Sequence, residues 1–186
     1  MHNATDLPVF KALANMPDRA MVFADAMKWH AMLPGYSAQY LVTAFPWGSD
    51  GELTVVDVGG GLGHISRALV DHSPIVKCIV QDSADVVMQG EEGLPADLRE
   101  RISFQTHNFF EEQPVKGADV YLLRLVLHDW SDKYSIMILK ALIPALKPGP
   151  KIVTTDRVIP GCGEAPYLVE REARSVPPIS TYSKRD

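Results

Sequence analysis

The residue in this chain best suited to acid–base chemistry is His128. It follows shortly after the predicted buried strand 119–124, and it opens the segment His-Asp-Trp-Ser-Asp at 128–132. The unperturbed pKa of histidine lies near neutrality, so an imidazole at a strand end is suited to remove a proton from a hydroxyl group. Taken alone, a histidine here is more often a helix-entry residue with a local hydrogen bond. Its chemistry therefore depends on what lies around it.

A second chemical signal is the glycine-rich turn that follows the apolar run 53–58. Glycine stands at 59, 60, 61 and 63, directly before a segment with helical character. Glycines between a strand and a helix let a ligand approach the backbone and aim the amides at the helix N-terminus toward it. The dinucleotide fingerprint would need its third glycine at 64, which is His64. The turn predicts a nucleotide-type cofactor site at the carboxyl end of a strand.

Asp82 provides a separate indication of the same ligand. It lies 25 positions beyond Asp57, at the end of the next predicted strand. A carboxylate there can accept hydrogen bonds from both hydroxyls of a ribose. The alternative is an ordinary solvated loop aspartate. With the glycine turn upstream, we favour the ribose contact.

The elements that position these residues alternate along the chain. Hydrophobic periodicity and turn residues predict α/β alternation, and hence a parallel sheet covered by helices on both faces. Ser131 is expected to cap the helix after His128, and glycines 90 and 93 to end the helix that begins at 84. The predicted strands are 53–58, 75–80, 102–106, 119–124 and 151–156, and the predicted helices are 17–32, 36–45, 64–72, 84–89 and 131–146.

The overall composition limits the functional class. The chain has 186 residues, of which 46% are hydrophobic and 22% charged, with a formal net charge of −5. An acidic chain without a Lys/Arg run does not favour a nucleic-acid partner. No apolar stretch has the length of a membrane span. Two cysteines and six scattered histidines predict neither a disulfide framework nor a metal site, so we expect a reducing cytoplasmic location.

Three ordered motifs together resemble one family. They are Asp-Val-Gly-Gly-Gly-Leu-Gly at 57–63, the Arg…His-Asp-Trp-Ser-Asp run at 124–132, and the helix–strand unit at 142–156. From about residue 40 to 165, the chain resembles the plant- and fungal-type, cation-independent O-methyltransferases that use S-adenosylmethionine. The fungal secondary-metabolite enzymes that methylate phenolic hydroxyls are the most similar. The resemblance implies a Rossmann-like class I methyltransferase fold and a small hydroxylated acceptor.

The resemblance also implies roles for individual residues. His128 corresponds to the general base, and Asp156 to the first of two carboxylates that orient it. No metal is implied. The cofactor side comprises Gly59 and Gly61 at the methionine portion, Asp82 at the ribose, Asn108 and Phe109 at the adenine, and Arg124 as a basic residue nearby.

The chain also departs from the family pattern. We expect a helical lead-in at 1–50 without the usual dimerisation domain, a cofactor-binding domain at 51–165, and an aberrant, disordered tail at 166–186. On this interpretation the chain is truncated at both ends, its second orienting carboxylate is absent, and the strand at 151–156 becomes a sheet edge. Full-length members are implied to be homodimers, and the sequence leaves dimerisation of this chain open. Asn108 replaces an acid and weakens the expected adenine contact.

Three functions therefore remain open at this point. The first is an S-adenosylmethionine-dependent O-methyltransferase acting on a small aromatic or secondary-metabolite hydroxyl. The second is an inactive cofactor-binding or scaffold fragment of the same family. The third is a nicotinamide-dependent oxidoreductase, which His64 disfavours.

Overall fold

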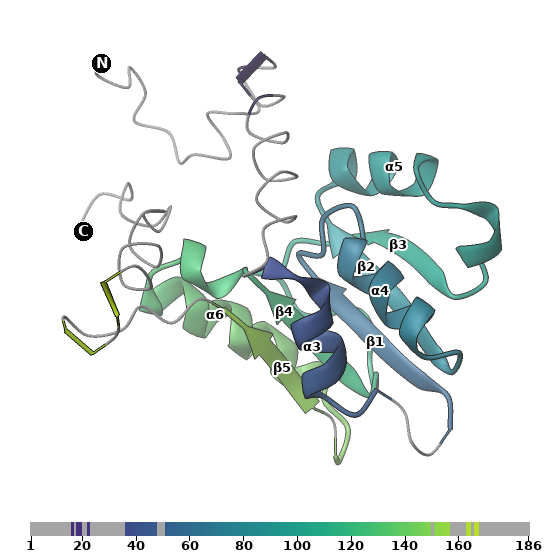
Figure 1. Cartoon of the computed structure of the whole chain (residues 1–186). Coiled ribbons are helices and arrows are strands. Elements are labelled where there is room, and N and C mark those ends of the chain that lie inside the picture. The colour runs from purple at the N-terminus through teal and green to yellow at the C-terminus, as the bar shows by residue number, and fades with distance from the viewer. Residues whose placement is uncertain are drawn as a thin grey trace.

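The fold is a five-stranded, wholly parallel sheet with helices packed on it (Figure 1). The computed structural model describes residues 16, 18, 19, 22, 36–47, 51–149, 151–156, 163, 164, 166 and 167. No helix within these ranges has the length and apolar character that crossing a membrane requires. The strands are β1 (Leu53–Val58), β2 (Val76–Asp82), β3 (Ile102–Thr106), β4 (Val120–Arg124) and β5 (Lys151–Thr155).

The strands lie in the order β3-β2-β1-β4-β5, so the chain first builds outward from β1 in one direction and then returns to extend the sheet in the other. β1 is hydrogen-bonded to both β2 and β4, with Val55 opposite Cys78 on one side and Val120 on the other. In doubly wound sheets, ligands bind where the winding direction reverses, outside the carboxyl ends of the strands. The reversal here lies between β1 and β4.

The helices connect the strands and cover the sheet. In chain order they are α3 (Ala38–Ala44), α4 (His64–His72), α5 (Ala84–Glu92) and α6 (Asp132–Leu142), with 3₁₀ turns η2 (Ala96–Leu98), η3 (Leu127–Asp129) and η4 (Ile143–Ala145). α3 packs against α4, whereas α5 packs on β3 and β2. Ser37 caps α3 by accepting a hydrogen bond from the backbone N–H of Gln39.

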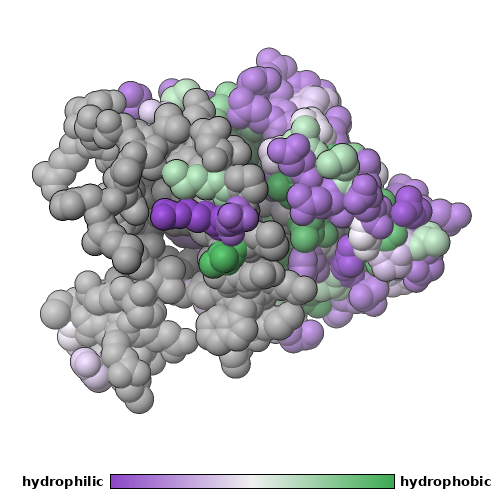
Figure 2. All heavy atoms as spheres, turned by 90° about the horizontal axis from the view of Figure 1, so that it is seen from above, coloured by the Kyte–Doolittle hydropathy of each residue, from purple (hydrophilic) through white to green (hydrophobic). Residues whose placement is uncertain are grey.

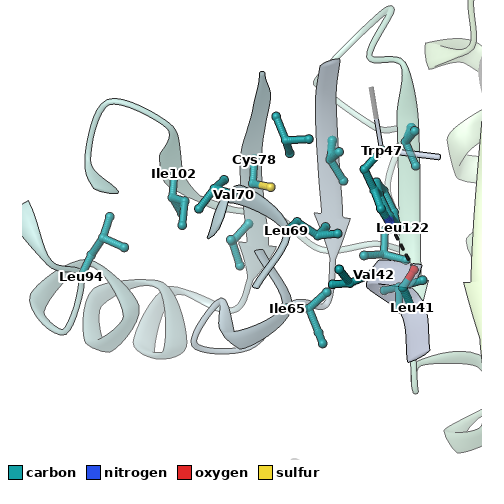
Figure 3. Packing of buried hydrophobic residues seen from close by; sticks show 14 residues of the cluster. Leu41, Val42, Trp47, Ile65, Leu69, Val70, Cys78, Leu94, Ile102 and Leu122 are labelled. Atoms are coloured by element: carbon teal, nitrogen blue, oxygen red, sulfur yellow. Dashed lines mark hydrogen bonds between the residues drawn. The ribbon is translucent and has the colours of Figure 1, made fainter. Parts of the chain in front are cut away.

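Strand alternation separates the apolar core into two clusters. On β1, Val55 belongs to the cluster under α3 and α4, whereas Val56 and Val58 belong to the cluster under α6. Successive side chains of a strand point to opposite faces, so a nearly continuous apolar strand fills both clusters. Figure 3 shows the first cluster, in which the indole N–H of Trp47 donates to the carbonyl of Leu41 at 3.1 Å. Seen from above, hydrophilic residues form most of the described surface in Figure 2.

The observed α/β architecture confirms the fold class, and all five predicted strands form. The prediction that Gly90 ends the helix was wrong, because α5 runs through Gly90 to Glu92. A Cβ at Gly90 would overlap the ring of Phe104, so this glycine allows close helix–sheet packing. Ser131 is the N-cap residue of α6, but its side chain makes no capping hydrogen bond.

Other differences concern element ends. α6 ends at Leu142 and continues as η4 around Pro144. β5 is the edge strand of the sheet formed by the described residues, as expected. Most of the predicted helix at 17–32 and of the predicted tail at 166–186 lies outside the described residues.

Candidate active site

The glycine turn after β1 adopts a backbone conformation that most other residues avoid. Gly59, Gly61 and Gly63 have φ angles of +70°, +58° and +74°. A side chain at such angles crowds the following carbonyl, so glycine is the residue suited to all three positions. The turn is fixed to β2, because the N–H groups of Gly59 and Gly60 both donate to the carbonyl of Gln81, at 2.8 and 3.1 Å.

Gly60 is required for a different reason, because it lies over a buried carboxylate. A Cβ at Gly60 would stand 2.6–2.9 Å from the carboxyl atoms of Asp57. Asp57 is 1% exposed and accepts a hydrogen bond from the hydroxyl of Ser66 at 2.8 Å. Burial raises the pKa of Asp57 to about 6, against the lowering effects of Ser66 and of the positive charge of Arg124.

Gly61 faces open space next to the proposed ribose acid. Beyond its two chain neighbours, no residue has a heavy atom within 4 Å of where its Cβ would stand. Its N–H donates to Oδ2 of Asp82 at 3.0 Å, and the other oxygen, Oδ1, accepts from the N–H of Ser83 at 2.7 Å. A carboxylate can accept about four hydrogen bonds, so Asp82 keeps capacity for two ligand hydroxyls. The structure thus brings two of the predicted cofactor residues together beside an unfilled volume.

The segment after β3 places Phe109 against the glycine turn. The position of a Cβ on Gly59 would be 3.8 Å from Cε1 of Phe109. Phe109 also packs edge-on against Trp130, with ring centroids 5.8 Å apart. The side chain of Asn108 is engaged locally, since Nδ2 donates to Glu111 and Oδ1 accepts from the N–H of Phe110.

Arg124 ends β4 and is held by the segment before α3. Its guanidinium donates to the backbone carbonyl of Tyr36. Burial lowers the pKa of Arg124, while the negative charge of Asp57 acts in the opposite direction. The two charged residues lie near the reversal point of the sheet, because β1 and β4 are paired strands with Asp57 opposite Leu122.

The chain leaves β4 through a strained residue, Leu125. Its φ of +54° makes it a non-glycine residue in the left-handed region, and its N–H donates to the carbonyl of Thr155 at 2.9 Å. Left-handed backbone costs an L-residue about 1–2 kcal/mol and tends to occur at functional sites. The next residue, Val126, is buried, and its Cγ2 lies 3.0 Å from where a Cβ of Gly59 would stand. The glycine turn and the turn carrying His128 are therefore neighbours.

His128 lies in η3 between two carboxylates. Its Nδ1 is 2.7 Å from Oδ1 of Asp156, and its Nε2 is 3.2 Å from Oδ1 of Asp129. The hydrogen bond with Asp156 raises the pKa of His128, burial lowers it, and the negative charges of Asp129 and Asp156 raise it further. Burial raises the pKa of Asp129 itself. That Oδ1 of Asp129 is buried and has no well-aligned hydrogen bond.

Three residues that sequence reasoning did not single out contribute to this site. Gln81 stands out as a polar residue in an apolar strand, and this could have identified it. Ser66 and Leu125 carry no comparable sequence signal. Asp129 belongs to the His-Asp-Trp-Ser-Asp motif, and the structure places its carboxylate beside the ring of His128.

Fold and site together define a Rossmann-like α/β protein of the class I methyltransferase type, with a glycine turn and an imidazole at one sheet edge. The chain belongs to the O-methyltransferase family, whose O-methyltransferase domain matches residues 2–173. It is 44% identical over 177 residues to a grayanic acid biosynthesis cluster O-methyltransferase of Cladonia grayi, a match that covers 94% of this chain and 39% of that protein.

Solved structures show the same likeness. Mitomycin 7-O-methyltransferase MmcR superposes with a TM-score of 0.75 at 28% identity, over 85% of this chain and 45% of that one. The O-methyltransferase NcsB1, in complex with S-adenosyl-L-homocysteine and 1,4-dihydroxy-2-naphthoic acid, superposes with a TM-score of 0.67 at 27% identity, over 78% and 43%. The chain spans about 40% of the length of the curated relatives it matches.

Proposed function

We propose that this protein is an S-adenosylmethionine-dependent O-methyltransferase that methylates a hydroxyl of a small aromatic or secondary-metabolite acceptor. The observation that carries the proposal is the placement of His128, with a carboxylate 2.7 Å from Nδ1, in a turn that neighbours the glycine turn. A base beside a nucleoside-type site is the arrangement that transfer to a hydroxyl requires.

The residues at the sheet edge fit the cofactor. Gly61 leaves open space beside Asp82, whose carboxylate has capacity for the ribose hydroxyls. Phe109 offers an aromatic surface beside Gly59 for the adenine. Asn108 precedes it in the chain, and Arg124 is the basic residue near the cofactor. Gly59 would lie along the methionine portion. When bound, S-adenosylmethionine supplies a methyl group on a cationic sulfur.

His128 and Asp156 perform the protein's part of the chemistry. With Nδ1 held by Asp156, Nε2 is the nitrogen that takes the hydroxyl proton of the acceptor as its oxygen becomes nucleophilic. Asp156 fixes the tautomer and stabilises the imidazolium that results. A positioned base of this kind contributes about 10²–10⁴ in rate, and alignment of the two reactants supplies much of the remainder.

The relatives support the acceptor class. One belongs to a grayanic acid biosynthesis cluster, and NcsB1 was crystallised with a dihydroxynaphthoic acid. The proposal includes action in the cytoplasm, supported by the low cysteine content and the buried free thiol of Cys78. It leaves dimerisation to measurement by light scattering.

Substitution of His128 tests the proposal. His128→Gln is expected to remove most methyl transfer, by about 10²-fold or more, and to leave affinity for S-adenosylhomocysteine within about twofold. The assay is radiolabel transfer from the methyl donor to a panel of hydroxynaphthoic and other phenolic acids, paired with calorimetric titration. Equal turnover by the variant would remove His128 from the mechanism.

The same pair of measurements distinguishes the other functions. Cofactor binding without transfer by the wild-type chain would support an inactive cofactor-binding or scaffold fragment. Tight nicotinamide binding without a response to S-adenosylhomocysteine would support an oxidoreductase, which the family match does not favour.

A further inference from the structure

Two buried glutamine side chains face each other between β2 and the segment that follows β3. Gln81 is 1% exposed and Gln113 is 0% exposed. Each amide donates to the other, with both Nε2–Oε1 distances at 2.8 Å. A reciprocal amide pair of this kind defines one relative orientation of the two side chains, which apolar contact of the same area would not do.

Every polar side-chain atom of this pair has a hydrogen-bond partner, as buried polar groups require. The second N–H of Gln81 Nε2 donates to Oε1 of Gln105 at 2.8 Å. Oε1 of Gln113 also accepts from the backbone N–H of Val115 at 3.1 Å. The pair is therefore joined to β3 on one side and to its own loop on the other.

Gln81 is also the residue that holds the glycine turn. Its backbone carbonyl accepts from the N–H groups of Gly59 and Gly60, and the next residue, Asp82, accepts from the N–H of Gly61. Three consecutive amides of the turn are thus fixed to two consecutive residues of β2. A displacement of Gln81 would move the methionine and ribose sides of the site together.

Gln113 belongs to the other side of the proposed cofactor cleft, the segment 107–117. Its N–H donates to the carbonyl of Ala141 on α6 at 3.0 Å, so its backbone is fixed to the helix that packs over the second core cluster. The segment 107–117 that contains Gln113 also carries Phe109, whose ring packs beside Gly59. The amide pair is therefore a direct side-chain link between β2, which supports the glycine turn, and the segment that carries Phe109.

We infer that the Gln81–Gln113 amide pair sets the spacing of the cofactor cleft, holding the segment that carries Phe109 in register with the glycine turn. This inference rests on the proposed function, since the cleft is the cofactor site proposed above. Both glutamines are positioning residues, because they act through Phe109 and the turn glycines rather than by contact with a ligand.

The test combines three methionine variants with two readouts, calorimetric affinity for S-adenosylhomocysteine and the urea midpoint of unfolding. Gln113→Met removes the reciprocal pair and is expected to weaken affinity about tenfold. Gln105→Met is the matched control, because it removes a hydrogen bond to the same Gln81 amide without touching the segment 107–117. It should change affinity by less than about twofold.

The double variant Gln81→Met/Gln113→Met separates positioning from stability. In this variant both glutamines are replaced by apolar side chains of similar shape, so neither amide of the pair is left buried without its partner. The urea midpoint should therefore recover relative to Gln113→Met. Affinity for S-adenosylhomocysteine should remain about tenfold weaker than in the wild type. The reciprocal hydrogen bonds that fix the orientation of the two segments are still missing in the double variant.

Each outcome decides the matter. Wild-type affinity in Gln113→Met, or affinity that recovers together with stability in the double variant, would overturn the inference. If Gln113→Met does not fold, the double variant alone decides, since its affinity is compared directly with the wild type and Gln105→Met. A wild-type chain that binds no S-adenosylhomocysteine would contradict the proposed function and, with it, this inference.

Discussion

Oδ1 of Asp156 lies 2.7 Å from Nδ1 of His128, although 28 residues separate the two along the chain. The contact exists because β4 and β5 are parallel neighbours, with Arg124 opposite Thr155 at their carboxyl ends. The turn after β4 then carries His128 back over the end of β5. Sheet topology, rather than local sequence, creates this pair.

Asp156→Asn should move the acid limb of the pH–activity profile to lower pH. The hydrogen bond with Asp156 is the largest cause of the raised pKa of His128, so an amide in its place lowers that pKa. A base is active when neutral, so the wild type gains activity as pH rises through a pKa above 6.5 and the variant gains it earlier. Maximal turnover should fall by about 10–100-fold, as orientation is lost.

The profile of kcat/KM against pH measures this change, and Asp132→Asn, at an exposed position in the first turn of α6, is the control. An acid limb that does not move in Asp156→Asn would show that the contact does not tune His128.

Asp129→Asn should shift the pKa of His128 in the same direction by a smaller amount. Asp129 acts on the imidazole through its charge, which ranks below the hydrogen bond with Asp156. Removing both carboxylates would leave burial as the remaining cause, so the double variant should have a His128 pKa below 6.5. NMR titration of the histidine resonances, assigned by comparison with His128→Gln, gives these values. A larger shift from Asp129→Asn than from Asp156→Asn would show that Asp129 has the greater effect on the pKa of His128.

Gly61→Ala and Gly117→Ala should separate the backbone role of a glycine from its role beside a ligand. Both glycines have positive φ, +58° and +69°, and neither leaves a severe clash for a Cβ. Each substitution should therefore lower the free energy of unfolding by about 1–2 kcal/mol. Only Gly61→Ala, whose methyl group would enter the open space beside Asp82, should weaken S-adenosylhomocysteine binding, by about tenfold.

Urea titration and calorimetry on the two variants provide these numbers. A comparable loss of affinity in both variants would mean that Gly61→Ala weakens binding through lost stability, and not because its methyl group fills the space beside Asp82.

The strands were predictable because each depends on a local pattern. β1 and β4 are nearly continuous apolar runs that fill both core clusters, and the glycines follow directly after β1. His128 and Asp82 were predicted at strand ends, where parallel topology gathers them at one edge.

The contacts that fix the site were not predictable, because they join residues distant in sequence or depend on conformation. Gln113 pairs with Gln81 across 32 positions, and nothing near Gln113 indicates burial. The positive φ of Leu125 follows from the connection between β4 and η3, since leucine has no preference for that region. Gly90 was taken as a helix end because its packing against Phe104 is a tertiary effect.

Asp57→Asn should stabilise the protein at alkaline pH and have no effect in acid. Burial raises the pKa of Asp57 from 3.8 to about 6, so ionisation costs the folded state about 3 kcal/mol at pH values above 6. Below pH 4 the group is protonated in both folded and unfolded chains, and the cost is absent. Asparagine keeps an acceptor for Ser66 but removes the countercharge of Arg124, so a gain of about 1–3 kcal/mol is expected at pH 8.

Urea unfolding of wild type and Asp57→Asn between pH 4 and pH 8 measures the difference directly. Asp71→Asn, on the exposed face of α4, is the control that should show no such trend. The gain should shrink as pH falls through about 6 and vanish near pH 4, because protonation then makes the wild-type carboxyl as neutral as the amide. A difference that stays constant across this range would mean that folding does not shift the pKa of Asp57, as expected if the carboxylate is solvated despite its burial.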